Sequence, residues 1–139
     1  MIIRVRGRSM TPAFQPGHFL WVRPSRPGLL RREAVVLVRR SRHPEGLYLK
    51  RLVGLPGEEI RLERGGLWID GRPLEEPYVP AASALEPRRD QRTQLGPDEY
   101  FVLGDARDDS LDSRSFGPIL AEEITGVVRC RVWPPFRCL

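Results

Sequence analysis

The segment EEIRLERGGLWIDGRPL, residues 58–74, contains the clearest structural signal in the sequence. Two runs with alternating apolar residues, 59–63 and 67–71, flank the pair Gly65–Gly66. Alternation with a period of two is typical of a half-buried strand, and a glycine pair between two such runs is typical of a tight turn. The segment therefore predicts a β-hairpin, and we expect the fold to be built from antiparallel strands.

Similar short apolar runs occur along the rest of the chain, separated by 14 prolines and 13 glycines. Helix is expected only at 118–124, which opens with a proline and ends before a glycine. Residues 81–97 have no clear period and are expected to form a flexible exposed loop. We predict one all-β domain over 1–139, made of coiled antiparallel sheets with a protruding β-hairpin and one short C-terminal helix. The further predicted strands are 2–7, 18–23, 34–39, 47–53, 100–104 and 125–133.

Composition narrows the class of protein. A hydrophobic fraction of 40% and a charged fraction of 29% are ordinary for a folded soluble domain. The net charge of +5 suits an anionic partner, either a nucleic acid or a lipid surface. No apolar run approaches the roughly 20 residues of a membrane span, and Met1 leads directly into a predicted strand without a secretory signal. We therefore expect a chain that either works without an anchor or has had one removed.

Cys130 and Cys138 are the only cysteines, and they stand eight residues apart. This spacing is no zinc motif, and His18 and His43 stand alone, so neither a metal nor a cofactor is expected. A disulfide and two packed thiols are both compatible with the spacing.

Lys50 is the only lysine in the chain, beside 22 arginines. Arginine is effectively always protonated, whereas a desolvated lysine can lose its proton and act as a base. In the predicted strand 47–53, Tyr48, Lys50 and Leu52 share one face, where apolar neighbours would lower the pKa of the amine. Lys50 is thus a candidate base, and the alternative is an ordinary surface lysine.

Two further segments carry polar groups that could serve such a base. GRSMTPAFQPG, residues 7–17, places Ser9 at the end of the first predicted strand. GDARDDSLDSRSFG, residues 104–117, holds four of the seven aspartates. Taken alone, Ser9 would be a turn residue and 104–117 a solvated loop. The aspartate spacing does not match a calcium-binding loop.

Together, in this order, these blocks resemble the type I signal peptidases, the serine–lysine endopeptidases that remove signal peptides from exported proteins. The resemblance covers nearly the whole chain apart from the 81–97 loop and the cysteine-bearing tail. It implies the coiled antiparallel sheets that signal peptidases share with self-cleaving repressors. The stretches that carry it are GRSMTPAFQPG (7–17), RREAVVLV (31–38), YLKRLVGLPGEEI (48–60), IDGRPLEEPYVP (69–80) and GDARDDSLDSRSFG (104–117).

The resemblance also implies roles for individual residues. Ser9 corresponds to the nucleophile and Lys50 to its general base, while the Ser110 hydroxyl would orient the lysine amine. The backbone N–H of Ser9 would stabilise the oxyanion, and Gly7 stands where many relatives place a hydroxyl as second donor. Two ion pairs would brace the site, Asp112 with Arg114 and Asp105 with Arg51.

Substrates are expected to pair as an added strand, with small side chains at the first and third positions before the cut. The residues expected to contact them are Ile3, Val5, Met10, Tyr48 and Leu49. The resemblance implies signal-peptide-bearing preproteins as substrates, and the protein would meet them at an anionic membrane surface. The location would be the outer face of the bacterial cytoplasmic membrane if an anchor is missing, and otherwise a soluble compartment.

Three alternatives compete with this interpretation. The first is an anchorless protease of the same family that matures a soluble precursor, as the maturation proteases of nickel superoxide dismutase do. The second is a self-cleaving repressor, but none of the eight residues before Ser9 forms the Ala–Gly or Cys–Gly site that this group cleaves. The third is a non-enzymatic basic β-domain that binds nucleic acid, which explains the charge and leaves Lys50 unexplained.

Overall fold

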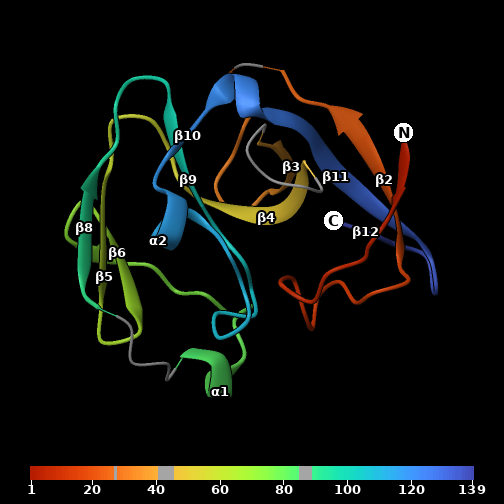
Figure 1. Cartoon of the computed structure of the whole chain (residues 1–139), viewed down its shortest axis with the longest axis horizontal. Helices are drawn as coiled ribbons and strands as arrows, with labels where there is room; N and C mark the ends of the chain where they lie inside the picture. Colours follow the sequence, from red (N-terminus) through yellow and green to blue (C-terminus); the bar gives the residue numbers. More distant parts are fainter. Residues whose placement is uncertain (27, 41–45, 85–88) are drawn as a thin grey trace.

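The computed structural model describes residues 1–26, 28–40, 46–84 and 89–139, and these residues form two antiparallel sheets (Figure 1). The larger sheet has the strand order β1-β2-β11-β3-β4-β9-β10, with β12 beside β11. Its strands are β1 (Ile2–Arg4), β2 (Phe19–Pro24), β3 (Val35–Arg39), β4 (Leu47–Gly54), β9 (Glu99–Leu103), β10 (Ile119–Leu120), β11 (Ile124–Trp133) and β12 (Arg137–Cys138). The prediction of a mostly β, antiparallel fold is confirmed.

The smaller sheet has the order β7-β6-β5-β8 and lies to one side of the larger one in Figure 1. Its strands are β5 (Glu59–Glu63), β6 (Gly66–Ile69), β7 (Arg72–Pro73) and β8 (Gln91–Gln94). Short helical turns complete the described part of the chain: α1 (Ala81–Ala84), α2 (Ser113–Phe116) and the 3-10 turn η1 (Ala121–Glu123).

The predicted hairpin is formed by β5 and β6, in which Glu63 lies opposite Gly66. The turn therefore consists of Arg64 and Gly65, one residue earlier than the glycine pair suggested. Both turn residues have positive φ angles, 49° and 76°, as a two-residue hairpin turn of type I′ requires.

Two segments differ from the sequence-based prediction. The expectation that 81–97 is a loop throughout is wrong, because α1 begins at Ala81 and β8 pairs with β5. Residues 85–88 of that segment lie outside the described residues. The predicted helix at 118–124 is shorter than expected, because Ile119 and Leu120 pair with β9 as β10 and only the η1 turn follows.

The core consists of three apolar clusters. One lies beneath β1, β2 and β3 and includes Val5, Met10 and Leu37. A second joins β3, β4, β9 and β10, and a third fills the space between the smaller sheet and the ends of β4 and β9. The first cluster supports the residues around Ser9, because Met10 is 1% exposed and directly follows that serine.

The pairing of β4 leaves half of one edge open. β4 pairs with β3 from Leu47 to Arg51, but it pairs with β9 only from Arg51 to Gly54. In the described part of the chain, no strand pairs with the second edge of β4 before Arg51, and the edge strand β1 lies at one end of the same sheet. Within the described residues, no helix is long and apolar enough to cross a membrane.

Candidate active site

A groove with a volume of about 510 Å³ lies between β1 with the loop that follows it and the first half of β4. The residues that the sequence suggested as substrate contacts all line it, namely Ile3, Val5, Met10, Tyr48 and Leu49. Leu37 and Leu111 line it as well and were not expected from the sequence. The groove also contains Ser9 and Lys50.

Ser9 and Lys50 are in direct contact, with Lys50 Nζ 2.7 Å from Ser9 Oγ in a hydrogen bond. The main-chain oxygen of Leu49 lies 3.5 Å from the same hydroxyl. Lys50 is 2% exposed, since its strand runs through the apolar centre of the sheet. Burial lowers the pKa of the Lys50 amine to about 8, against a smaller opposing effect from Asp112. An amine with this pKa is partly neutral near pH 8 and can accept the proton of the hydroxyl.

The Asp112 carboxylate organises the loop 104–114. Its oxygens accept hydrogen bonds from the Arg114 guanidinium at 2.8 and 2.9 Å and from the Gly104 N–H at 3.0 Å. Burial acts to raise the pKa of Asp112, but the hydrogen bonds and charge of Arg114 outweigh it, and the pKa lies below its usual value. Asp112 also caps α2, because it accepts a bond from the Arg114 N–H. The pair that the sequence suggested is therefore present.

The second expected ion pair is also present, between Arg51 and Asp105. Arg51 Nε and Nη2 donate to the two carboxylate oxygens at 2.8 and 2.6 Å. Asp105 is fully buried, and burial raises its pKa in spite of the opposing effect of Arg51. The next residue, Ala106, donates its N–H to the Ser9 main-chain oxygen at 3.0 Å. The acidic loop thus fixes the backbone of the serine.

Gly104 allows this close approach of the two loops. A Cβ atom at this position would lie 2.1 Å from Ser110 Oγ and 2.6 Å from the Ser9 main-chain oxygen. Such distances are far below van der Waals contact, so only glycine fits between the serine loop and the acidic loop.

Ser110 Oγ is buried next to this glycine, and its hydroxyl contributes to lowering the pKa of Asp112. Among the described residues, no partner meets the hydroxyl in good hydrogen-bond geometry. Its expected role in orienting the Lys50 amine therefore stays a prediction.

A buried cluster that the sequence did not suggest connects the acidic loop to the segment after β7. Arg107 Nε donates to the Gly104 main-chain oxygen at 2.9 Å, and Arg107 forms a bidentate ion pair with Glu76. The Tyr78 hydroxyl donates to the same glutamate at 3.0 Å, and the Arg51 guanidinium lies 4.0 Å from the Tyr78 ring centroid. The sequence signal for this cluster is that Glu76, Tyr78 and Arg107 all belong to stretches that resemble the family.

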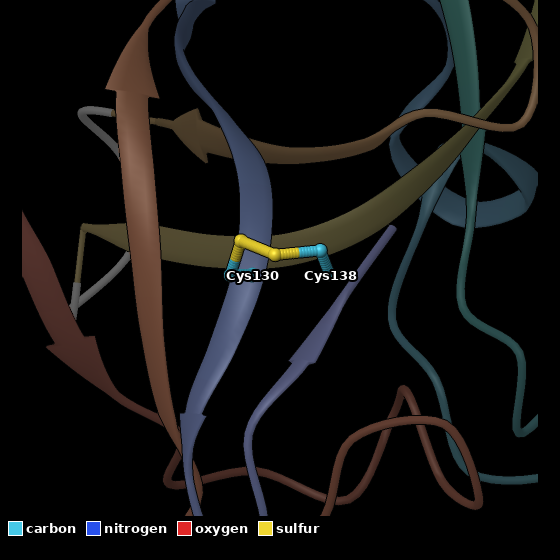
Figure 2. The surroundings of a disulfide bond; sticks show 2 residues. All are labelled: Cys130 and Cys138. Atoms are coloured by element: carbon cyan, nitrogen blue, oxygen red, sulfur yellow. A yellow bond between two sulfur atoms is a disulfide. The ribbon is translucent and has the colours of Figure 1, made fainter.

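Cys130 and Cys138 are joined by a disulfide (Figure 2). The two residues are direct cross-strand partners on β11 and β12, so the bond ties the C-terminal strand to the larger sheet. In the described part of the chain, no group of three or more His, Cys, Asp or Glu residues could hold a metal ion.

Comparison with solved structures shows the class of fold. Signal peptidase I from Enterococcus faecalis superposes with a TM-score of 0.62 at 28% identity, over 76% of this chain and 98% of that one. The arrangement of sheets around the groove is thus that of a signal peptidase.

Sequence comparison gives the family. The family described as signal peptidase, peptidase S26, matches residues 1–133, so the chain belongs to this peptidase family. Signal peptidase I of Bacillus caldolyticus is 33% identical over 94% of this chain and 78% of its own length. The probable signal peptidase I-2 of Synechocystis is 37% identical over 63% of this chain, and the match spans 38% of that protein.

Proposed function

We propose that this chain is a serine endopeptidase that removes signal peptides from preproteins by cutting after small residues, with Ser9 as nucleophile and Lys50 as general base. The observation that carries the proposal is the contact of 2.7 Å between a serine hydroxyl and a buried amine of lowered pKa, inside a groove with open strand edges. Family membership supports the same activity.

In the first step, the neutral Lys50 amine takes the proton of the Ser9 hydroxyl while Ser9 Oγ bonds to the scissile carbonyl carbon. The resulting ammonium group then gives this proton to the leaving nitrogen, and the C–N bond breaks. A water molecule, deprotonated by the same amine, then attacks the ester carbonyl carbon; the bond between this carbon and Ser9 Oγ breaks, and the ammonium group returns the proton to Ser9 Oγ. No histidine is needed, because the amine performs each proton transfer.

The oxyanion formed in the attack needs hydrogen-bond donors, each of which contributes about 3–4 kcal/mol in well-organised sites. We assign the Ser9 N–H as one donor. Gly7 lies where a side-chain donor would be expected, and a Cβ there would meet no atom within 4 Å. The position is therefore open, and the second donor is a backbone group or a water molecule.

We assign the two ion pairs, Asp112–Arg114 and Arg51–Asp105, to support of the catalytic groups. They hold the loop that carries Ser110 against the Ser9 backbone. A substrate would pair with the open edges of β1 and β4 as an added strand. We assign Ile3, Val5 and Leu49, which line the groove, to the apolar subsites that receive small side chains.

The test is cleavage of a peptide that spans a signal-peptide cleavage site. Ser9→Ala and Lys50→Arg should each remove activity, the second because arginine keeps the charge but cannot become a base. For the wild-type protein, kcat/KM should rise with pH and level off above an apparent pKa near 8, since the neutral amine is the active form. Turnover by Lys50→Arg close to that of the wild type would refute the assignment.

We also propose contact with an anionic membrane surface, where signal peptides leave the bilayer. Trp133 and Phe136, at 65% and 68% exposed, flank the turn between β11 and β12, and Trp21 on the neighbouring β2 is 43% exposed. Aromatic rings suit the headgroup region, and nearby arginines add about 1 kcal/mol each on anionic lipid.

Co-sedimentation with vesicles of mixed neutral and anionic phospholipid tests the membrane contact. Wild-type protein should bind in low salt, and Trp133→Ala/Phe136→Ala should bind several-fold more weakly. Equal binding by both proteins, or binding by neither, would exclude this turn as a membrane contact.

A further inference from the structure

The first strand presents alternate backbone groups to the groove. Met1 exchanges hydrogen bonds with Val22 of β2, and Val5 forms hydrogen bonds with His18 and Gly17, which directly precede β2. In an antiparallel ladder the residues between such partners direct their N–H and C=O groups to the opposite edge. β1 is the outermost strand of its sheet, so the backbone groups of Arg4 and Arg6 face the open groove.

Side chains on this strand alternate in the same way. Val5 is buried in the core beneath the groove, and Ile3 packs against the same cluster. Arg4, Arg6 and Arg8 are exposed and line the groove. None of these three arginines has an ion-pair partner within the part of the chain that the structure describes. The groove therefore has an apolar floor and one rim with three positive charges that have no ion-pair partner among the described residues; the Arg4 guanidinium lies 5.9 Å from the Phe19 ring centroid.

A peptide that pairs with this edge as an added strand must also place successive side chains on opposite faces. Small side chains that enter the floor are separated by side chains that face solvent on the arginine side. Opposite charges on directly opposed residues of neighbouring strands attract, and each such pair strengthens binding by roughly two- to threefold. Near Ser9 the groove also holds a negative charge, because Asp109 lines it and acts on the Lys50 amine. We therefore base the selection on Arg4 and Arg6 and leave Arg8 out.

We propose that Arg4 and Arg6 make this groove select peptides with Asp or Glu at the solvent-facing positions, the second and fourth before the cut. The selection rests on the proposed function, because it assumes that the groove binds the acyl side of the substrate. It narrows the substrate class to cleavage regions in which small residues alternate with acidic ones.

Three peptides test the selection. All have small residues at the first and third positions before the cut, and they carry Glu, Gln or Lys at both the second and the fourth. For the wild-type protein in low salt, kcat/KM should be about fivefold higher for Glu than for Gln, and lowest for Lys. The ratio should fall toward one in 0.5 M NaCl, because the rim charges are exposed to solvent.

Two double variants distinguish the effect of the rim arginines from the effect of the protein's net charge. Arg4→Gln/Arg6→Gln should reduce the Glu-to-Gln ratio to about one. Arg31→Gln/Arg72→Gln removes the same charge from exposed arginines outside the groove and should keep the ratio. A wild-type ratio of one, or a ratio that survives the loss of Arg4 and Arg6, would overturn the selection.

Binding to Ser9→Ala tests the rim without the chemistry. This variant keeps the groove, so its affinity, measured by fluorescence anisotropy of labelled peptides, should follow the same order, Glu above Gln above Lys. If no peptide is cleaved by the wild type but this order holds, the proposed activity fails and the rim selection stands. If the peptides are cleaved and bound equally well, the rim selection fails and the proposed activity stands.

Discussion

Lys50 and Arg51 are neighbours on β4, but the surroundings of Arg51 stabilise its positive charge, whereas those of Lys50 destabilise it. Arg51 meets the buried carboxylate of Asp105 in a bidentate ion pair and lies over the Tyr78 ring. Lys50, on the other face of the strand, is 2% exposed and its nearest partner is the neutral hydroxyl of Ser9. Burial lowers the pKa of this amine to about 8.

Neighbouring residues of one strand thus serve the structure and the chemistry of the site. A buried charge with a bidentate partner remains charged and fixes the loop that bears its partner. A buried amine without a carboxylate partner gives up its proton more easily and gains use as a base. The same substitution at the two positions should therefore have effects of opposite sign on stability.

The largest effect is expected for Arg51→Met. It leaves Asp105 buried without its ion-pair partner, which typically costs about 3–5 kcal/mol of the free energy of unfolding. The pKa of Asp105 is already raised by burial and would rise further, so the loss should be full at neutral pH and shrink as the carboxyl group becomes protonated in acid. Urea denaturation at pH 7 and pH 5 measures both.

Asp105→Asn in the Arg51→Met background is the control. It removes the unpaired charge and should recover part of the lost stability at pH 7. A fully stable Arg51→Met protein would show that the pair does not brace the acidic loop.

Lys50→Met should stabilise the fold while removing activity. A pKa lowered from 10.5 to about 8 means that holding the charged amine costs on the order of 3 kcal/mol below pH 8. The variant also loses the hydrogen bond to Ser9, worth about 1 kcal/mol, so a net gain of about 2 kcal/mol is expected.

The pH dependence of this gain follows from linkage. The folded wild type releases the proton at lower pH than the unfolded chain, so wild-type stability rises between about pH 8 and 10.5. The advantage of Lys50→Met should therefore be present at pH 6 and vanish toward pH 10.5. A variant that is less stable than the wild type at pH 6 would contradict the view of Lys50 as a destabilising buried charge.

Much of this fold follows from local pattern. The alternating or continuously apolar runs became β1 to β6, β9 and β11, because such runs bury at least one face of a sheet. β8 was missed because QRTQ contains no apolar residue; it forms through its pairing with β5 across the smaller sheet. β10 was missed because its two residues lie within the helix-like run 118–124 and carry no strand period of their own.

The candidate site likewise contains some residues that the sequence predicts and others that it does not. Ser9, Lys50 and the two ion pairs could be named from the order of motifs, through the family resemblance. The contact of Arg107 with Glu76 joins distant loops and leaves no local spacing to detect. The rim charge of Arg4 and Arg6 needed the strand's register, which decides that their backbone faces the groove.

The variant Ser110→Ala tests whether a second hydroxyl, besides that of Ser9, orients the Lys50 amine. If the Ser110 hydroxyl orients the amine, its loss should lower kcat about tenfold. A buried amine with one polar neighbour fewer holds its proton less well, so the acid limb of the pH–rate profile should also move to lower pH.

Ser113→Ala is the matched control in the same loop. Its hydroxyl accepts a hydrogen bond from the Val102 N–H at 3.0 Å, so its loss should lower stability and leave the pH limb in place. An unchanged limb in Ser110→Ala would make Ser110 a structural residue like Ser113.

The smallest effect on activity is expected where the oxyanion forms on the substrate during the attack. The Lys50 amine has a side-chain hydroxyl, that of Ser9, as its hydrogen-bond partner. The oxyanion has no side-chain donor at Gly7. A Cβ there meets nothing within 4 Å, so Gly7→Ser should fold normally and bring a hydroxyl to this position. A donor added to an unoptimised site should raise kcat by roughly three- to tenfold, well below the contribution of an evolved one. Gly7→Ala separates the hydroxyl from the loss of backbone freedom. If serine and alanine change kcat alike, the position does not face the oxyanion, and the second donor must come from elsewhere in the groove.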